Sequence, residues 1–139
     1  MQHDHLFDTS IRDNLLLGNG DATDEQLLQA CAVAGLGPFL TQRTDALEAP
    51  IGPNGSMLSG GERQRLMVAR ALVADAPILV LDEATEHLEP ELRTGIISAI
   101  ARTRRGRTTI FLGHDLAELD AVGLDVVIDL TDGRLEPRP

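Results

Sequence analysis

The stretch ILVLDEAT, residues 78–85, decides the fold class of this chain. Four apolar residues stand in a row after a proline, and Asp82 and Glu83 follow them. Such a run is typical of a strand that is buried on both faces of a parallel sheet. Residues 108–112 and 126–130 read as two further strands, with helices predicted between the three. The order strand, helix, strand, helix, strand predicts an α/β fold in which helices cover a parallel sheet.

Helix signals lie on both sides of the first strand. Thr23 with Gln26, and Ser59 with Glu62, have the spacing of capping boxes, so we expect helices to begin at both places. Other segments complete the pattern: a short helix or turn at 10–17, a loose stretch at 41–57, a helix from Pro90 to about Gly106, a short helix at 116–122 and a tight turn at 132–133. We therefore expect one domain, mainly helical at about residues 10–75 and α/β at about 76–139.

Composition narrows the class of protein. The chain has 139 residues, which suits one domain or part of one, with 42% hydrophobic and 24% charged residues, as in soluble globular proteins. Acidic residues outnumber basic ones by 22 to 12, and the net charge of -10 disfavours nucleic acid and anionic membrane surfaces as partners. All the basic residues except the histidines are arginine, and the single cysteine, Cys31, is expected in the core. No apolar run is long enough to insert into a membrane.

Polar groups follow two of the predicted strands. Asp82 and Glu83 end the first, and His114 follows the second. Parallel sheets bind ligands at the carboxyl ends of their strands. One carboxylate there could bind Mg²⁺ and the other could orient a water molecule, while His114 could donate to a phosphate oxygen. Taken singly, each of these residues also fits an ordinary loop.

The turn Ser59-Gly60-Gly61 is an anion site in outline. It opens a predicted helix, where backbone N–H groups and the helix dipole favour negative charge, and its glycines leave those groups accessible. As an isolated tripeptide it equally fits a flexible turn into a capped helix.

Together, in order and spacing, these segments resemble the ATP-binding cassette (ABC) family of transporters. LSGGERQR at 58–65 and ARAL at 69–72 precede residues 78–85 and His114. The resemblance covers nearly the whole chain, because Gln2 stands at the position of the family's Q-loop glutamine and LFDTSIRDNL at 6–15 looks like exporter cassettes. DEATEHL at 82–88 looks closest to the cysteine and glutathione exporter needed for cytochrome bd assembly.

The resemblance implies a partial P-loop NTPase (RecA-like) sheet with an α-helical signature subdomain, and ATP and Mg²⁺ as cofactors. It implies that Asp82 holds Mg²⁺ through water, that Glu83 polarises the hydrolytic water and that His114 senses the γ-phosphate. It places Gln2 against the metal and the water, linking the site to a membrane domain. The signature residues would bind ATP held by a partner cassette in a head-to-tail dimer: Ser59, Gly60, Gly61 and Glu62.

The chain departs from the family's pattern in several places. A P-loop needs a lysine, and this chain has none. We therefore expect a C-terminal fragment that lacks the first strand, the P-loop and the antiparallel β-subdomain, and that is catalytically silent alone. Residues 86–89 read Glu-His-Leu-Glu where Ser-Ala-Leu-Asp is usual, Pro53 replaces a common glutamate, and Glu62 replaces the commoner glutamine.

The expected function is that of the ATP-hydrolysing cassette of an exporter, at the cytoplasmic face of the membrane through a transmembrane domain, with the segment itself soluble. Two alternatives remain open. One is a non-catalytic module that docks on an intact cassette, and the other is an ATPase of the DNA-repair or chromosome-maintenance type, which the acidic composition disfavours. The arginines at 102–107 are interpreted as a solvated helix end, and His3 and His5 lack the further ligands of a metal site.

Overall fold

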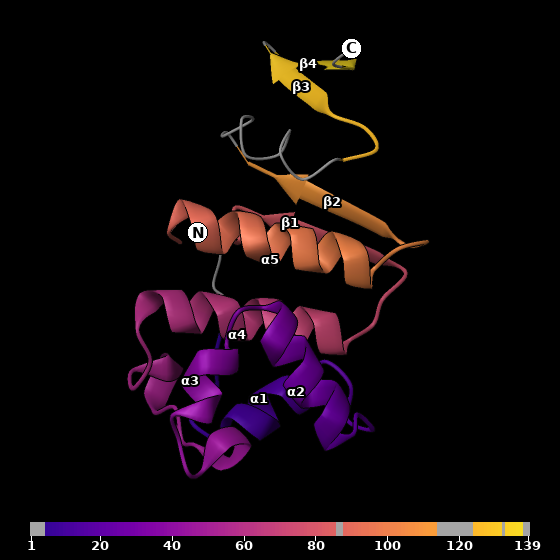
Figure 1. The fold of residues 1–139 in the computed structure, drawn as a ribbon. Helices are drawn as coiled ribbons and strands as arrows, with labels where there is room; N and C mark the ends of the chain where they lie inside the picture. Colours follow the sequence, from indigo (N-terminus) through magenta and orange to yellow (C-terminus); the bar gives the residue numbers. More distant parts are fainter. Residues whose placement is uncertain (1–4, 86–87, 114–123, 132, 138–139) are drawn as a thin grey trace.

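The computed structural model describes residues 5–85, 88–113, 124–131 and 133–137 (Figure 1). In chain order the elements are α1 (Ile11–Leu16), α2 (Asp24–Val33), α3 (Gly37–Thr41), the 3₁₀ helices η1 (Ala46–Glu48) and η2 (Pro53–Gly55), α4 (Gly60–Val73), β1 (Ile78–Asp82), α5 (Pro90–Thr103), β2 (Thr108–Leu112), β3 (Ile128–Thr131) and β4 (Arg134–Pro137). In Figure 1, α1 to α4 lie together at one end, and β3 and β4 lie at the other.

Both predicted capping boxes are confirmed. At the start of α2, the Thr23 backbone N–H donates to Gln26 Oε1 at 2.8 Å, and the Gln26 N–H donates to Thr23 Oγ1 at 3.3 Å. α4 begins in the same way at Ser59. A threonine or serine three residues before a glutamine or glutamate satisfies two otherwise unpaired helix donors, which is why both starts could be predicted from local sequence.

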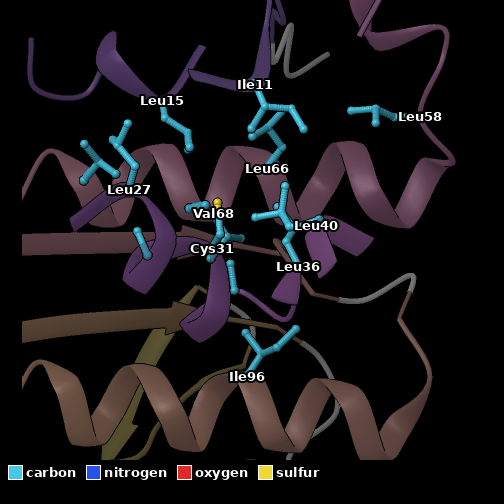
Figure 2. Close-up of a cluster of buried hydrophobic side chains, with 14 of the residues drawn as sticks. Ile11, Leu15, Leu27, Cys31, Leu36, Leu40, Leu58, Leu66, Val68 and Ile96 are labelled. Carbon is cyan, nitrogen blue, oxygen red and sulfur yellow. The ribbon is translucent and has the colours of Figure 1, made fainter. Parts of the chain in front are cut away.

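The core lies between α2 and α4. Leu27 and Cys31 of α2 and Leu66 and Ala69 of α4 are all at most 1% exposed, so the expected place of Cys31 in the core is confirmed. Figure 2 shows the labelled side chains gathered around α4, with Ile96 of α5 directed at the same cluster. Burial of this kind, at about 25 cal/mol per Å² of apolar surface, is the main force that holds the helices together.

Cys31 offers a pH test of this core. Burial raises the pKa of its thiol from 9.0 to about 12. The unfolded chain releases the proton near pH 9.0, whereas the folded chain holds it, so the free energy of unfolding should fall as the pH rises between these values, by about 1.4 kcal/mol per pH unit. The chain has no lysine or tyrosine side chain to titrate in this window. Urea denaturation across the window measures the slope, and Cys31→Ala should abolish it; a slope that survives the substitution would contradict this assignment.

The prediction that residues 41–57 form a loose stretch is wrong. Leu47, Ala49 and Ile51 are at most 5% exposed, and η1 and η2 lie within the stretch. The Ile11 N–H donates to Ala49 O at 3.0 Å, and the Ile51 N–H donates to Thr9 O at 3.1 Å. The apolar residues between the glycines and prolines pair this segment with the start of α1, a contact that local turn signals do not show.

The two central strands form the expected parallel pair. β1 and β2 pair in register from Ile78 opposite Thr108 to Asp82 opposite Leu112. Burial of β1 on both faces is wrong here, since Leu79 is 7% exposed but Val80 is 53% exposed. The described elements cover only the face that Leu79 and Leu81 share.

The third predicted strand does not join this parallel pair. β3 instead pairs antiparallel with β4, with Thr131 opposite Arg134. Gly133, at φ +75°, stands in the connection, and a reversal this short pairs a strand with its neighbour in sequence. The helix predicted at 116–122 lies outside the described residues.

The arginines after α5 are not all solvated, which corrects the interpretation above. Arg104 is 5% exposed, and burial lowers the pKa of its guanidinium. Its Nη2 donates to Ala76 O at 2.7 Å and its Nε donates to Thr109 Oγ1 at 3.1 Å. Arg107 pairs with Asp75, which lies beside Ala76 in the loop between α4 and β1. These two arginines therefore tie the entry of β1 to the entry of β2.

Candidate functional site

The N-terminus of α4 carries the first part of the candidate site. Ser59 Oγ accepts a hydrogen bond from the Glu62 N–H at 3.2 Å, and Glu62 Oε2 accepts one from the Ser59 N–H at 2.7 Å. Ser59 and Gly60 are exposed. Because Ser59 Oγ uses a lone pair in the cap, its own proton remains available for an acceptor outside the helix.

Nothing in the described part of the chain sterically requires glycine at position 60. A methyl group there would meet one atom within 4 Å, Nη2 of Arg63 at 3.8 Å, and the backbone has no positive φ. A methyl group on Gly61 would lie 3.3 Å from Leu88 and 3.8 Å from Arg65 Nη1. Two guanidinium groups thus flank a helix end whose backbone is open, and this arrangement favours an anion.

Arg63 also fixes the approach to this turn. Its Nη1 donates to Leu58 O at 2.8 Å, one residue before the cap. At Gly55, with φ +71°, a methyl group would come within 2.9 Å of Arg63 Cδ and of Leu6. Sequence reasoning missed this role. A signal did exist, since a cation in the first turns of a helix opposes the dipole and therefore needs acceptors of its own.

The acid pair forms the second part of the site. Asp82 is the last residue of β1, opposite Leu112 of β2, and Glu83 follows it directly. Both are exposed at the carboxyl end of the strands, as predicted. Glu83 has φ +50°, a left-handed conformation that costs about 1–3 kcal/mol in a residue with a side chain and that recurs at functional sites.

One hydrogen bond joins the two parts. Gln64 Nε2, on α4, donates to the backbone oxygen of Glu83 at 3.1 Å. Two of the predicted site residues, Gln2 and His114, lie outside the described residues. Their placement beside the acid pair therefore stays a prediction.

The donor set fits Mg²⁺ and phosphate in part. Asp82 supplies an exposed hard oxygen, and Mg²⁺ is commonly held by one or two carboxylates together with waters and substrate phosphates. In the ranges that the structure describes, no group of three or more His, Cys, Asp or Glu side chains could hold a metal by itself.

His5, weighed above as a possible metal ligand, packs edge-on against the ring of Phe7, with ring centroids 4.9 Å apart.

No helix of the described segments is both long and apolar enough to cross a membrane.

Comparison with known proteins identifies relatives of the chain. The model of the family described as ABC transporter matches residues 1–86. The beta-(1→2)glucan export ATP-binding/permease proteins NdvA of Agrobacterium vitis and of Bartonella bacilliformis are each 42% identical over 130 residues, covering 94% of this chain and 22% of theirs. The structure of a bacterial Atm1-family ABC exporter with ATP bound matches with a TM-score of 0.84 and 33% identity, over 96% of this chain and 23% of that one. The chain thus spans about a fifth of the length of these relatives.

Proposed function

Because the chain belongs to the ABC transporter family, we propose that it forms the part of an exporter's ATP-binding cassette that contains the signature turn and the acid pair. The observation that carries this proposal is the capped, open turn at Ser59 and Gly60, flanked by Arg63 and Arg65. The cassette-type α/β fold expected from the sequence is confirmed by the structural match. The division at about residue 75 remains part of the proposal.

At the signature turn, the groups that face solvent would bind a terminal phosphate. The Ser59 hydroxyl donates a proton, and the exposed Gly60 backbone leaves room for a phosphate oxygen to approach. Gly61 keeps the role predicted for it above, beside Gly60 in the turn. Glu62 keeps the turn in shape through its bond to the Ser59 N–H. We propose that the phosphate belongs to ATP held by a partner cassette in a head-to-tail dimer, as the resemblance implies.

At the acid pair, Asp82 would hold Mg²⁺ through water and Glu83 would orient and polarise the attacking water. When bound, Mg²⁺ neutralises charge on the phosphate oxygens. Gln2 and His114 keep the roles predicted for them above, in contact with the metal and water and with the γ-phosphate. The exposed position of Asp82 and Glu83 at the strand end supports this assignment.

We propose that the chain alone does not hydrolyse ATP. No lysine is present to contact the β- and γ-phosphates as a P-loop lysine does. Incubation of the purified chain with Mg-ATP should therefore release no phosphate above background. Rapid turnover by the chain alone would contradict this part of the proposal.

We propose a transmembrane export domain as the second partner and the cytoplasmic face of the membrane as the location. The named relatives are ATP-binding/permease proteins, which supports this partner. Because all of these relatives are exporters, the DNA-repair type of ATPase and the stand-alone docking module are not favoured. The likeness to the cysteine and glutathione exporter depends on residues 82–88 alone and stays a prediction, since the relatives named above export β-glucan or belong to the Atm1 family.

Gly60→Ala tests the signature turn. The chain should associate with an exporter cassette that has its own P-loop and ATP, because the turn completes that cassette's phosphate site. A methyl group at Gly60 would stand where the phosphate approaches, and loss of one charged hydrogen bond, about 1.5–3 kcal/mol, should weaken the ATP-dependent association about tenfold or more. Light scattering with and without ATP measures the association.

Gly95→Ala is the matched control. Gly95 lies in α5, and a methyl group there would meet nothing within 4 Å. At Gly60 a methyl group would meet only Arg63 Nη2, at an ordinary contact distance of 3.8 Å, so both substitutions leave the packing of the chain intact. Equal association of both variants, or association that ignores ATP, would contradict the proposed role of the turn.

A further inference from the structure

Both backbone polar groups of Glu83 are held by neighbouring elements. The Glu83 N–H donates to Leu112 O, at the end of β2, at 3.0 Å. The Glu83 carbonyl oxygen accepts from Gln64 Nε2, on α4, at 3.1 Å. With φ +50°, this residue is in a conformation that persists only where its surroundings hold it, and Gln64 is one of the two groups that do so.

The two amide atoms of Gln64 differ in their surroundings. Its Oε1 is buried and has no hydrogen-bond partner in the described part of the chain. An unpaired buried acceptor destabilises a fold, and an unbranched apolar side chain of the same length would avoid that loss. The donor to Glu83 therefore gives a glutamine at this position a role that an apolar side chain could not fill.

A second contact also joins α4 to the chain that follows β1. Leu88, 7% exposed, packs on Gly61, where an added methyl group would come within 3.3 Å of Leu88 Cδ2. The Leu88 N–H donates to Thr85 O at 3.1 Å, which ties Leu88 to the chain just after the acid pair. Two residues in the first turns of α4 therefore contact the chain after β1. Gln64 bonds to Glu83, and Gly61 lies against Leu88.

We propose that Gln64 is a positioning residue that couples the signature turn to the backbone of Glu83 within one chain. The inference rests on the proposed function, in which the two ends of this link are two different half-sites for ATP. A change at the N-terminus of α4 then alters how tightly Glu83 is held, because the same helix carries Ser59 and Gln64. In this proposal Gln64 acts through the backbone of Glu83 and not directly on phosphate or metal.

Gln64→Met provides the first test. It removes the donor to Glu83 and also the unpaired acceptor, so the midpoint of urea unfolding should change little. Amide hydrogen exchange at Glu83 should become about tenfold faster, because the loss of this hydrogen bond makes local opening of the Glu83 backbone easier. Gln29→Met, at an exposed position of α2, is the matched control and should leave exchange at Glu83 unchanged.

A double-mutant cycle with Ser59→Ala distinguishes coupling from a merely structural bond. Loss of the Ser59 cap loosens the first turn of α4, and exchange at Glu83 should become about threefold faster, within the range for residues that share a network. In the Gln64→Met background, the same change should have no effect at Glu83. If Ser59→Ala leaves Glu83 unchanged in the parent chain, or accelerates its exchange equally in both backgrounds, the proposal is wrong. The cycle needs no nucleotide, so its failure is distinct from failure of ATP-dependent association.

Discussion

Glu83→Gln is expected to lower the rate of ATP hydrolysis by about 10²–10⁴-fold, the usual contribution of a positioned general base. The assay requires an assembly in which this chain supplies the acid pair and a P-loop segment supplies the lysine. Glutamine keeps the size of the side chain but cannot accept the proton of the attacking water. Because Glu83 is exposed and its contacts to Leu112 and Gln64 use only the backbone, binding of ATP should persist. Phosphate release and nucleotide binding, measured on the same preparation, separate the two effects.

Glu91→Gln is the matched control for this experiment. Glu91 is an exposed carboxylate in the first turn of α5, and the same exchange of carboxylate for amide there should leave the rate unchanged. If Glu83→Gln retains the parent rate, or if Glu91→Gln lowers it equally, Glu83 is not the base.

Leu66→Ala is expected to have the largest effect on stability, about 2–5 kcal/mol, the usual cost of truncating a fully buried leucine. Leu66 is 1% exposed in the middle of α4 and belongs to the cluster that joins α1, α2 and α4. The loss combines the transfer free energy of the side chain with the cavity that it leaves. Urea denaturation followed by circular dichroism measures the change. The signature turn begins the same helix, so loss of this packing should also loosen it.

Leu28→Ala controls for the chemistry of the substitution. Leu28 is 45% exposed on α2, so the same truncation there removes little buried surface and should cost well under half as much as Leu66→Ala. Equal losses at both positions would mean that the cluster around α4 is not the core of this chain.

The helix starts and the candidate residues of the site could be predicted from sequence because their signals are local. A serine or threonine followed three residues later by a glutamate or glutamine satisfies helix donors wherever the helix lies, and both capping boxes formed. Asp82 and Glu83 likewise end a strand because apolar residues precede them and charged residues favour solvent.

Contacts between distant segments could not be predicted in this way. Gln64 gives no sign in sequence that its amide reaches the backbone of Glu83, nineteen residues away. Arg104 was interpreted as a solvated residue because charged residues usually are, yet it is buried against Ala76 O. Residues 41–57 contain many turn residues, which is why the sequence predicts a loose stretch there. Their hydrogen bonds to the start of α1 are visible only in the tertiary structure.

By itself, the sequence determined the fold class, the starts of α2, α4 and α5 and the chemical groups that a phosphate or a metal would meet, because periodicity, capping and residue type act over a few neighbouring residues. The tertiary structure decided which backbone is held by which side chain. It decided that Gln64 binds Glu83, that Arg63 and Arg65 flank the glycines, and that one face of β1 is covered. Such contacts depend on how elements pack, and packing joins residues whose separation along the chain carries no local signal.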